Sequence, residues 1–224
     1  MKANKSAQGY GEYIRTLIKE WPVNKPITTD AVATELAETF FIDIISAKKI
    51  TNVNMKRLSD KGKVLRVQKG IYGKVKNTQF GILKPSADEI MASLLLRDGD
   101  KAIGHLAGPT LLNLIGLSTW MPGEYHIATN GFRRRIPESA RICVYRPAVP
   151  VNDDNVRYLQ AIEAITAMEK FHTDAERPDD ILREMFYRNN IDNEKLIWYA
   201  RKYYSKRTLL RTIDVALGGL DYIL

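Results

Sequence analysis

Apolar residues recur at three- and four-residue spacing through much of the chain, and this period predicts amphipathic helices. The most informative of them begins near residue 44 and ends at Gly62, since glycine suits the left-handed conformation that follows many helices. One face of this predicted helix is largely apolar: Ile44, Ala47, Thr51, Asn54, Met55 and Leu58. The opposite face carries cationic and amide side chains: Lys48, Lys49, Asn52, Lys56 and Arg57.

The hydrophobic pattern changes from a helical to an alternating period directly after this helix. Residues 64–68 and 71–75 each read as a strand, and Gly70 between them allows a tight turn. A helix, a glycine stop and a basic hairpin in this order indicate a winged helix-turn-helix. In such a module the last helix enters the DNA major groove and the hairpin is the wing. The alternative is a solvated basic helix face beside an ordinary hairpin.

Two more helices are predicted upstream of this segment. Residues 7–21 place aromatic and aliphatic side chains on one helical face, and Pro22 ends that helix. Residues 28–30 suit the N-cap of a second helix, and residues 25–27 look like a short extended piece that pairs with the wing. Together these elements predict an N-terminal DNA-binding domain over residues 1–77.

The remaining pattern predicts a second domain, residues 85–224, after a linker over residues 77–86. Ser86 and Glu89 form an S-x-x-E capping box, which opens a helix through about Arg97.

Farther along, residues 105–116 read as a short apolar helix and Tyr125–Thr129 as a strand. Asn130-Gly131 is a strong hairpin signal, with residues 141–146 as the partner strand. From Asn155 onward, apolar residues at helical spacing predict four helices. The expected fold class is α+β: an N-terminal winged helix-turn-helix followed by a mixed α/β C-terminal domain with a helical end.

Composition becomes informative when the charged residues are counted separately for the two predicted parts of the chain. The net charge is +8, and residues 1–77 hold 15 Lys and Arg against 7 Asp and Glu. The rest of the chain holds 19 basic and 19 acidic residues, so the whole excess lies in the N-terminal third. A localised positive potential steers a module to a polyanion such as DNA.

The side chains of the predicted reading helix fit duplex DNA chemically. Asn can form paired hydrogen bonds with adenine, and Lys or Arg with guanine, in the major groove. Lys69, Lys74 and Lys76 on the predicted wing suit phosphate contacts, which add affinity without choosing sequence. Arg133-Arg134-Arg135 after the Asn130-Gly131 turn is a further candidate contact with nucleic acid or a partner. The alternative for these arginines is a solvated loop paired with acidic residues.

Other features narrow the class of protein. The chain lacks an apolar run as long as a membrane span, and its start lacks the apolar core of a secretory signal, so we expect a cytoplasmic protein. Its single cysteine, Cys143, agrees with a reducing compartment. His105, His126 and His172 are far apart and lack zinc-ligand spacing, so we expect no metal site and no cofactor.

An enzymatic alternative is a DNA-targeted, metal-dependent endonuclease. Its acidic ligands, with Lys101 beside them, would be Asp88, Glu89, Asp98, Asp100 and Glu124. The first two residues also suit a helix start, and the next two suit a turn. Because the chain carries no P-loop, no dinucleotide fingerprint and no nucleophile elbow, we expect no enzymatic activity.

Several runs of the sequence resemble AbiEi-like antitoxins of bacterial type IV toxin–antitoxin systems. The resemblance extends from about residue 8 to about residue 147, and more loosely through the final helices. It is carried by GYGEYI, MKRLSDKGKVLRVQKGIYG, PSADEIMASLLLRDGDKAIGHLAGPTLLNLIGLST and YHIATNGFRRRI.

This resemblance implies a two-domain protein whose N-terminal winged helix binds inverted repeats at its own promoter and represses the operon. Two copies would then share one operator, as two-fold operators generally require. It also implies that the C-terminal domain opposes a nucleotidyltransferase-like toxin, and it leaves open whether the two proteins touch.

Overall fold

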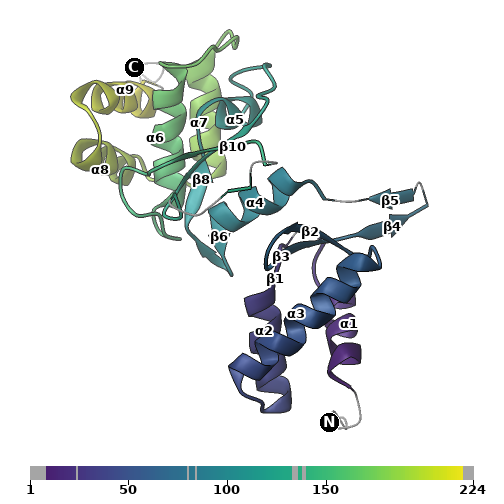
Figure 1. The fold of residues 1–224 in the computed structure, drawn as a ribbon. Helices are drawn as coiled ribbons and strands as arrows, with labels where there is room; N and C mark the ends of the chain where they lie inside the picture. Colours follow the sequence, from purple (N-terminus) through teal and green to yellow (C-terminus); the bar gives the residue numbers. More distant parts are fainter. Residues whose placement is uncertain are drawn as a thin grey trace. The chain divides into compact units, whose positions relative to one another are not determined.

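The computed structural model describes residues 9–23, 25–79, 81–83, 85–132, 136–137 and 140–218. The protein is mixed α and β with small sheets, which confirms the prediction at this coarse level. The chain divides into two compact units, one up to Ser93 and one from Leu94 (Figure 1). The bounds expected from sequence, 1–77 and 85–224, stay a prediction.

Helices α1 (Tyr10–Glu20), α2 (Thr29–Phe40) and α3 (Ile44–Asp60) pack around one apolar core in the first unit (Figure 1). Side chains cap two of them: the Thr28 hydroxyl accepts from the Ala31 N–H at 3.2 Å, and the Asp43 carboxylate accepts from the Ser46 N–H at 2.9 Å. The core they enclose is aliphatic and aromatic: Ile14, Ile18, Ile27, Val32, Ala33, Leu36, Ala47, Met55, Leu58, Val64 and Tyr72.

A three-stranded antiparallel sheet completes this core. Its order is β1 (Ile27–Thr28), β3 (Ile71–Lys74) and β2 (Val64–Gln68). Gly70 forms the β2–β3 turn at a φ of 81°, which an L side chain rarely adopts. The predicted helix-to-hairpin change is therefore confirmed. A short extended piece does pair with the hairpin, but it is Ile27–Thr28 rather than residues 25–27.

The segment predicted as a linker is instead a second hairpin. Strands β4 (Lys76–Thr78) and β5 (Gly81–Leu83) pair antiparallel and extend away from the three-stranded sheet (Figure 1). The chain can reverse here because Gly81 takes a φ of 117° and the Thr78 hydroxyl donates to its carbonyl oxygen.

Helix α4 (Ala87–Leu96) follows the hairpin and begins at the predicted capping box. The Glu89 N–H donates to the Ser86 hydroxyl at 3.0 Å, and the Ser86 N–H donates to the Glu89 carboxylate at 3.1 Å. Both reciprocal bonds of the box are therefore present. The predicted turn after α4 joins two short strands, β6 (Arg97–Asp98) and β7 (Lys101–Ala102).

The central sheet of the second unit has the order β10 (Ile142–Tyr145), β9 (Tyr125–Thr129) and β8 (Gly104–Leu106). The apolar helix predicted over residues 105–116 is partly wrong, because residues 105 and 106 belong to strand β8. The helix expected there, α5 (Gly108–Leu114), is shorter and begins only after the strand.

The predicted hairpin at Asn130-Gly131 is also wrong. Strand β9 pairs with β10 in parallel, so the chain does not turn back directly after Thr129. The Asn130 side chain exchanges two hydrogen bonds with the Val151 main chain, both 2.8 Å long. Its own N–H donates to Ile103 at 2.8 Å. These long-range bonds replace the local turn that the dipeptide favours.

Helices α6 (Val156–Met168), α7 (Pro178–Arg188), α8 (Asn193–Tyr203) and α9 (Lys206–Leu217) confirm the predicted helical end. Helix α6 contacts the other three as well as α5 and β8, so it is the centre of the second core (Figure 1). Among the described residues, none of the helices combines the length and the apolar character that crossing a membrane requires.

Candidate nucleic-acid interface

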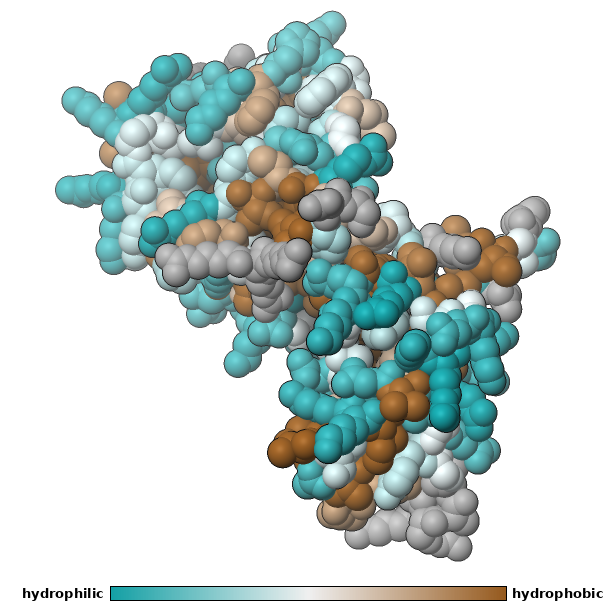
Figure 2. Space-filling view, in the orientation of Figure 1, coloured by the Kyte–Doolittle hydropathy of each residue, from teal (hydrophilic) through white to brown (hydrophobic). Residues whose placement is uncertain are grey.

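Helix α3 has one buried and one exposed face, as its sequence period predicts. Ala47, Thr51, Met55 and Leu58 are buried in the core of the first unit. The exposed side contains all the predicted DNA-reading side chains: Lys48, Lys49, Asn52, Lys56 and Arg57. In Figure 2 hydrophilic side chains cover the front of the first unit, interrupted by apolar atoms. A row of donors on a rigid helix can address base edges and phosphates together.

One of these cations has a partner within the same unit. The Lys48 ammonium lies 2.8 Å from the Asp30 carboxylate near the start of α2, and the two side chains are 50% and 77% exposed. An ion pair this exposed contributes about 0–1 kcal/mol. Lys48 can therefore exchange Asp30 for a phosphate at little cost.

The predicted wing lysines differ in their surroundings. Lys69 in the β2–β3 turn and Lys76 at the start of β4 are exposed. The Lys74 ammonium instead donates to two main-chain oxygens of the first unit, that of Lys19 at 2.5 Å and that of Trp21 at 2.7 Å. Lysine near a helix C-terminus satisfies its last carbonyls. Lys74 thus ties β3 to the end of α1, a structural role that sequence reasoning did not anticipate.

Three exposed residues near this face were missed by the sequence reasoning. Ile45 and Val53 on α3 are 65% and 50% exposed, and Arg66 on β2 is also exposed. The helical period contains the signal for the first two. Ile45 lies four residues before Lys49, and Asn52 and Val53 lie three and four residues after it, so these residues share one side of the helix. Exposed aliphatic groups on such a face can contact the methyl group of thymine. Ile44, predicted on the apolar face, is itself 43% exposed.

Arg133, Arg134 and Arg135 lie outside the described residues, so their candidate contact stays a prediction.

Two acidic residues of the nuclease alternative have local partners. Glu89 completes the capping box with Ser86, and Glu124 lies 3.5 Å from the His126 ring. Within the described ranges, no group of three or more His, Cys, Asp and Glu side chains could hold a metal ion.

Two of the histidines named from sequence, His105 and His126, are buried. Burial lowers the pKa of His105, whose ring nitrogen Nδ1 lies 2.9 Å from the Leu106 carbonyl oxygen. The pKa of His126 is also lowered by burial, against the opposing charge of Glu124. The Nδ1 atom of His126 lies 2.7 Å from the Tyr145 hydroxyl.

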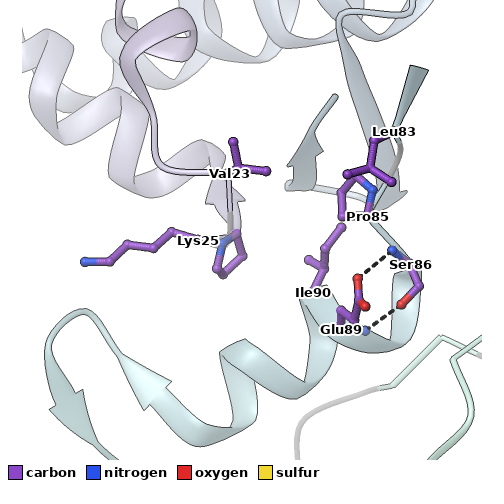
Figure 3. A pocket seen from close by; sticks show the side chains of 8 residues that line it. Val23, Lys25, Leu83, Pro85, Ser86, Glu89 and Ile90 are labelled. Carbon is purple, nitrogen blue, oxygen red and sulfur yellow. Dashed lines mark hydrogen bonds between the residues drawn. The ribbon is translucent and has the colours of Figure 1, made fainter. Parts of the chain in front are cut away.

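A pocket of about 570 Å³ lies in the first unit between the approach to β1 and the start of α4 (Figure 3). Its wall is mainly aliphatic: Val23, Pro26, Leu83, Pro85 and Ile90. The lining acid, Glu89, accepts a hydrogen bond from the Ser86 N–H, and its own N–H donates to the Ser86 hydroxyl, as the dashed lines in Figure 3 mark. Lys25 and Ser86 complete the lining.

The chain matches a family model over most of its length. The model of the family described as "Family of unknown function (DUF6088)" matches residues 26–189. That range covers α2, α3, the hairpins and the second unit through α7. None of the curated proteins compared with the chain matches it.

Proposed function

The chain belongs to DUF6088, a family of unknown function, and we propose that it is a sequence-specific double-stranded DNA-binding protein. The observation that supports this proposal most strongly is that α3 has two chemically different faces. This helix buries an apolar face and exposes a row of lysine, arginine and asparagine side chains.

The first unit would act as a winged helix-turn-helix. Its element order supports this assignment: α2 and α3 are joined by the short turn 41–43, and the antiparallel pair β2–β3 follows. In that type of module the second helix of the pair lies in the major groove and the hairpin lies against the backbone. Helix α3 would then read bases, and Lys69 and Lys76 would contact phosphates.

Base choice would come from the middle of α3. Asn52 can form two hydrogen bonds with adenine, and Arg57 two with guanine, each good pair contributing about 1–3 kcal/mol of discrimination. The surrounding lysines would release counterions from DNA, so affinity would fall steeply with salt.

The biological setting that we propose is that of an AbiEi-like antitoxin, which the resemblance of the sequence runs supports. In this setting the protein binds an inverted repeat near its own gene as two copies and represses its operon in the cytoplasm. The second unit would counteract a nucleotidyltransferase-like toxin.

The DNA-binding proposal is tested by gel-shift titration of the full chain with the duplex upstream of its coding sequence. The control is a scrambled duplex of equal length and composition. We expect the upstream duplex to bind at least about 10³-fold more tightly, in the range of specific DNA-binding proteins. Equal affinity for the two duplexes would contradict the proposal.

The antitoxin proposal needs a separate measurement. In cells whose growth is arrested by a nucleotidyltransferase-like protein encoded beside it, co-expression of the chain should restore growth. A Lys49→Ala/Asn52→Ala variant should restore growth equally. This result would assign neutralisation to a function other than DNA reading. No restoration of growth by the unaltered chain would refute the antitoxin role without touching DNA binding.

A further inference from the structure

The second unit contains a cavity of about 470 Å³ that DNA binding does not explain. Its lining comes from segments far apart in the sequence: β8, the start of α5, β9, the end of β10, α6 and the α8–α9 turn. Small-molecule sites usually have volumes of about 300–1,000 Å³ and a few polar groups among apolar walls. The size and construction of this cavity agree with such a site.

The polar groups of the cavity include a carboxylate that is largely removed from water. Burial raises the pKa of Glu163, while the Gly108 N–H and the Lys170 charge oppose the rise. The bond from the Gly108 N–H to this carboxylate is 3.3 Å, which is long for its type. The two oxygens of a carboxyl group can form more hydrogen bonds than this one, so Glu163 retains capacity for a ligand.

A tyrosine lies beside this acid. Burial raises the pKa of Tyr204, and the Glu163 charge raises it further, so its hydroxyl stays protonated. Tyr204 and Glu163 therefore offer a donor and several acceptors in one cavity. Phe171 and Tyr145 add aromatic surface to the same lining.

Two cations, Arg146 and Lys170, line the same cavity and are exposed to solvent. The Arg146 guanidinium lies 5.7 Å from the centre of the Phe132 ring. Within the described part of the chain, neither cation forms an ion pair. Cations of this kind bind phosphate through charge-assisted hydrogen bonds.

We infer that this cavity binds a guanine nucleotide, with the base edge on Glu163 and the phosphate on Arg146 and Lys170. Guanine presents two adjacent N–H donors on its pairing edge, which match the two oxygens of one carboxylate. Adenine presents an acceptor beside its donor, and that acceptor faces a carboxyl oxygen without a hydrogen bond when the donor is paired with the other oxygen. The aromatic side chains would contact the face of the base.

Isothermal titration of the full chain with GMP, guanosine and AMP tests this inference. We expect GMP to bind, guanosine to bind at least tenfold more weakly, and AMP to bind more weakly than GMP. The variant Glu163→Gln keeps an acceptor for the Gly108 N–H but places an amide donor against the base. It should therefore retain the fold and lower GMP affinity at least tenfold.

The phosphate contact has its own variant and control. Arg146→Ala/Lys170→Ala should reduce GMP affinity to that of guanosine and leave guanosine unchanged. Arg201→Ala removes a positive charge from the exposed side of α8, away from the cavity lining, and should change neither ligand. Absence of GMP binding, tighter binding of AMP, or unchanged GMP affinity in Glu163→Gln would overturn the inference.

Discussion

The Lys74 ammonium on β3 donates a hydrogen bond to the main-chain oxygen of Trp21, 2.7 Å away at the end of α1. This contact joins the strand of the predicted wing to a helix that the DNA-binding proposal does not use. Lys74, which the sequence predicted to contact DNA phosphate, therefore also stabilises the fold. Stability and affinity measurements can separate the two roles.

We predict that Lys74→Ala lowers the free energy of unfolding by about 1–2 kcal/mol, since a charged donor is lost from two main-chain oxygens, an exposed one at Lys19 and a half-buried one at Trp21. Lys76→Ala should leave that free energy within about 0.5 kcal/mol, as for exposed sites generally. Urea unfolding measures both. Lys76→Ala should weaken all DNA sequences alike and reduce the salt slope by about 1. Equal unfolding curves for the two variants would contradict the structural role of Lys74.

A second prediction concerns base reading by Asn52. Asn52→Ala should cost about 1–3 kcal/mol of binding to the preferred duplex and relax the choice at one base pair. Asn54 on the same helix is the matched control, because its amide donates to the Ile50 carbonyl at 2.9 Å instead of facing solvent. Asn54→Ala should leave base choice intact in a binding-site selection. Loss of base choice in the control alone would place the reading face elsewhere.

A third prediction follows from the two exposed aliphatic residues of α3, Ile45 and Val53. If they contact thymine methyl groups, replacing thymine by uracil at the contacted positions of a selected duplex should weaken binding. Ile45→Ala should abolish that difference between thymine and uracil at its own position. Competition gel shifts measure the effect. A selected duplex that binds equally well with uracil throughout would exclude methyl contacts while leaving the DNA-binding proposal intact.

The sequence predicted the first unit well because its signals are local. Helix α3 and the hairpin after it follow from a change of period and from glycines at 62 and 70, each of which acts within a few residues. The face of α3 that carries Lys49 and Asn52 follows from the same period. The apolar positions of the same pattern identify the residues of α3 that are buried in the core.

The failures have a common cause in long-range bonding. Asn130-Gly131 favours a hairpin locally, but Asn130 is bound to Val151 and Ile103, which no local pattern contains. The sequence pattern predicts Lys74 as a phosphate-binding lysine of the wing, because it does not show that the end of α1 lies beside β3. The cavity around Glu163 draws its lining from six separate segments, so the sequence offered no spacing that could predict it.

A fourth prediction concerns pH and the start of α3. Hydrogen bonds from the Ser46 hydroxyl and N–H hold the pKa of Asp43 below its ordinary value. A lowered pKa in the folded state stabilises the fold above the ordinary value, about 3.9. This contribution disappears as the pH falls through the lowered pKa. Asp43→Asn keeps the cap without a charge, so wild type should lose stability relative to this variant as the pH drops from about 5 to 3. Parallel pH profiles from urea unfolding would contradict this linkage.

The last prediction separates the two faces of α3. Thr51 lies fully buried on the core side, and its hydroxyl has no hydrogen-bond partner among the described residues. A buried hydroxyl without a partner costs about 1–3 kcal/mol, and valine has nearly the same shape without that group. Thr51→Val should therefore raise the free energy of unfolding by about 1 kcal/mol.

The same substitution should leave DNA affinity and base choice unchanged, because the exposed row of α3 is untouched. Calorimetric unfolding and gel shift on one preparation measure both properties. A loss of stability would mean that the hydroxyl has a partner, such as a buried water. A change in base choice would mean that the core side of α3 sets the position of its reading side, and the two faces would then not be independent.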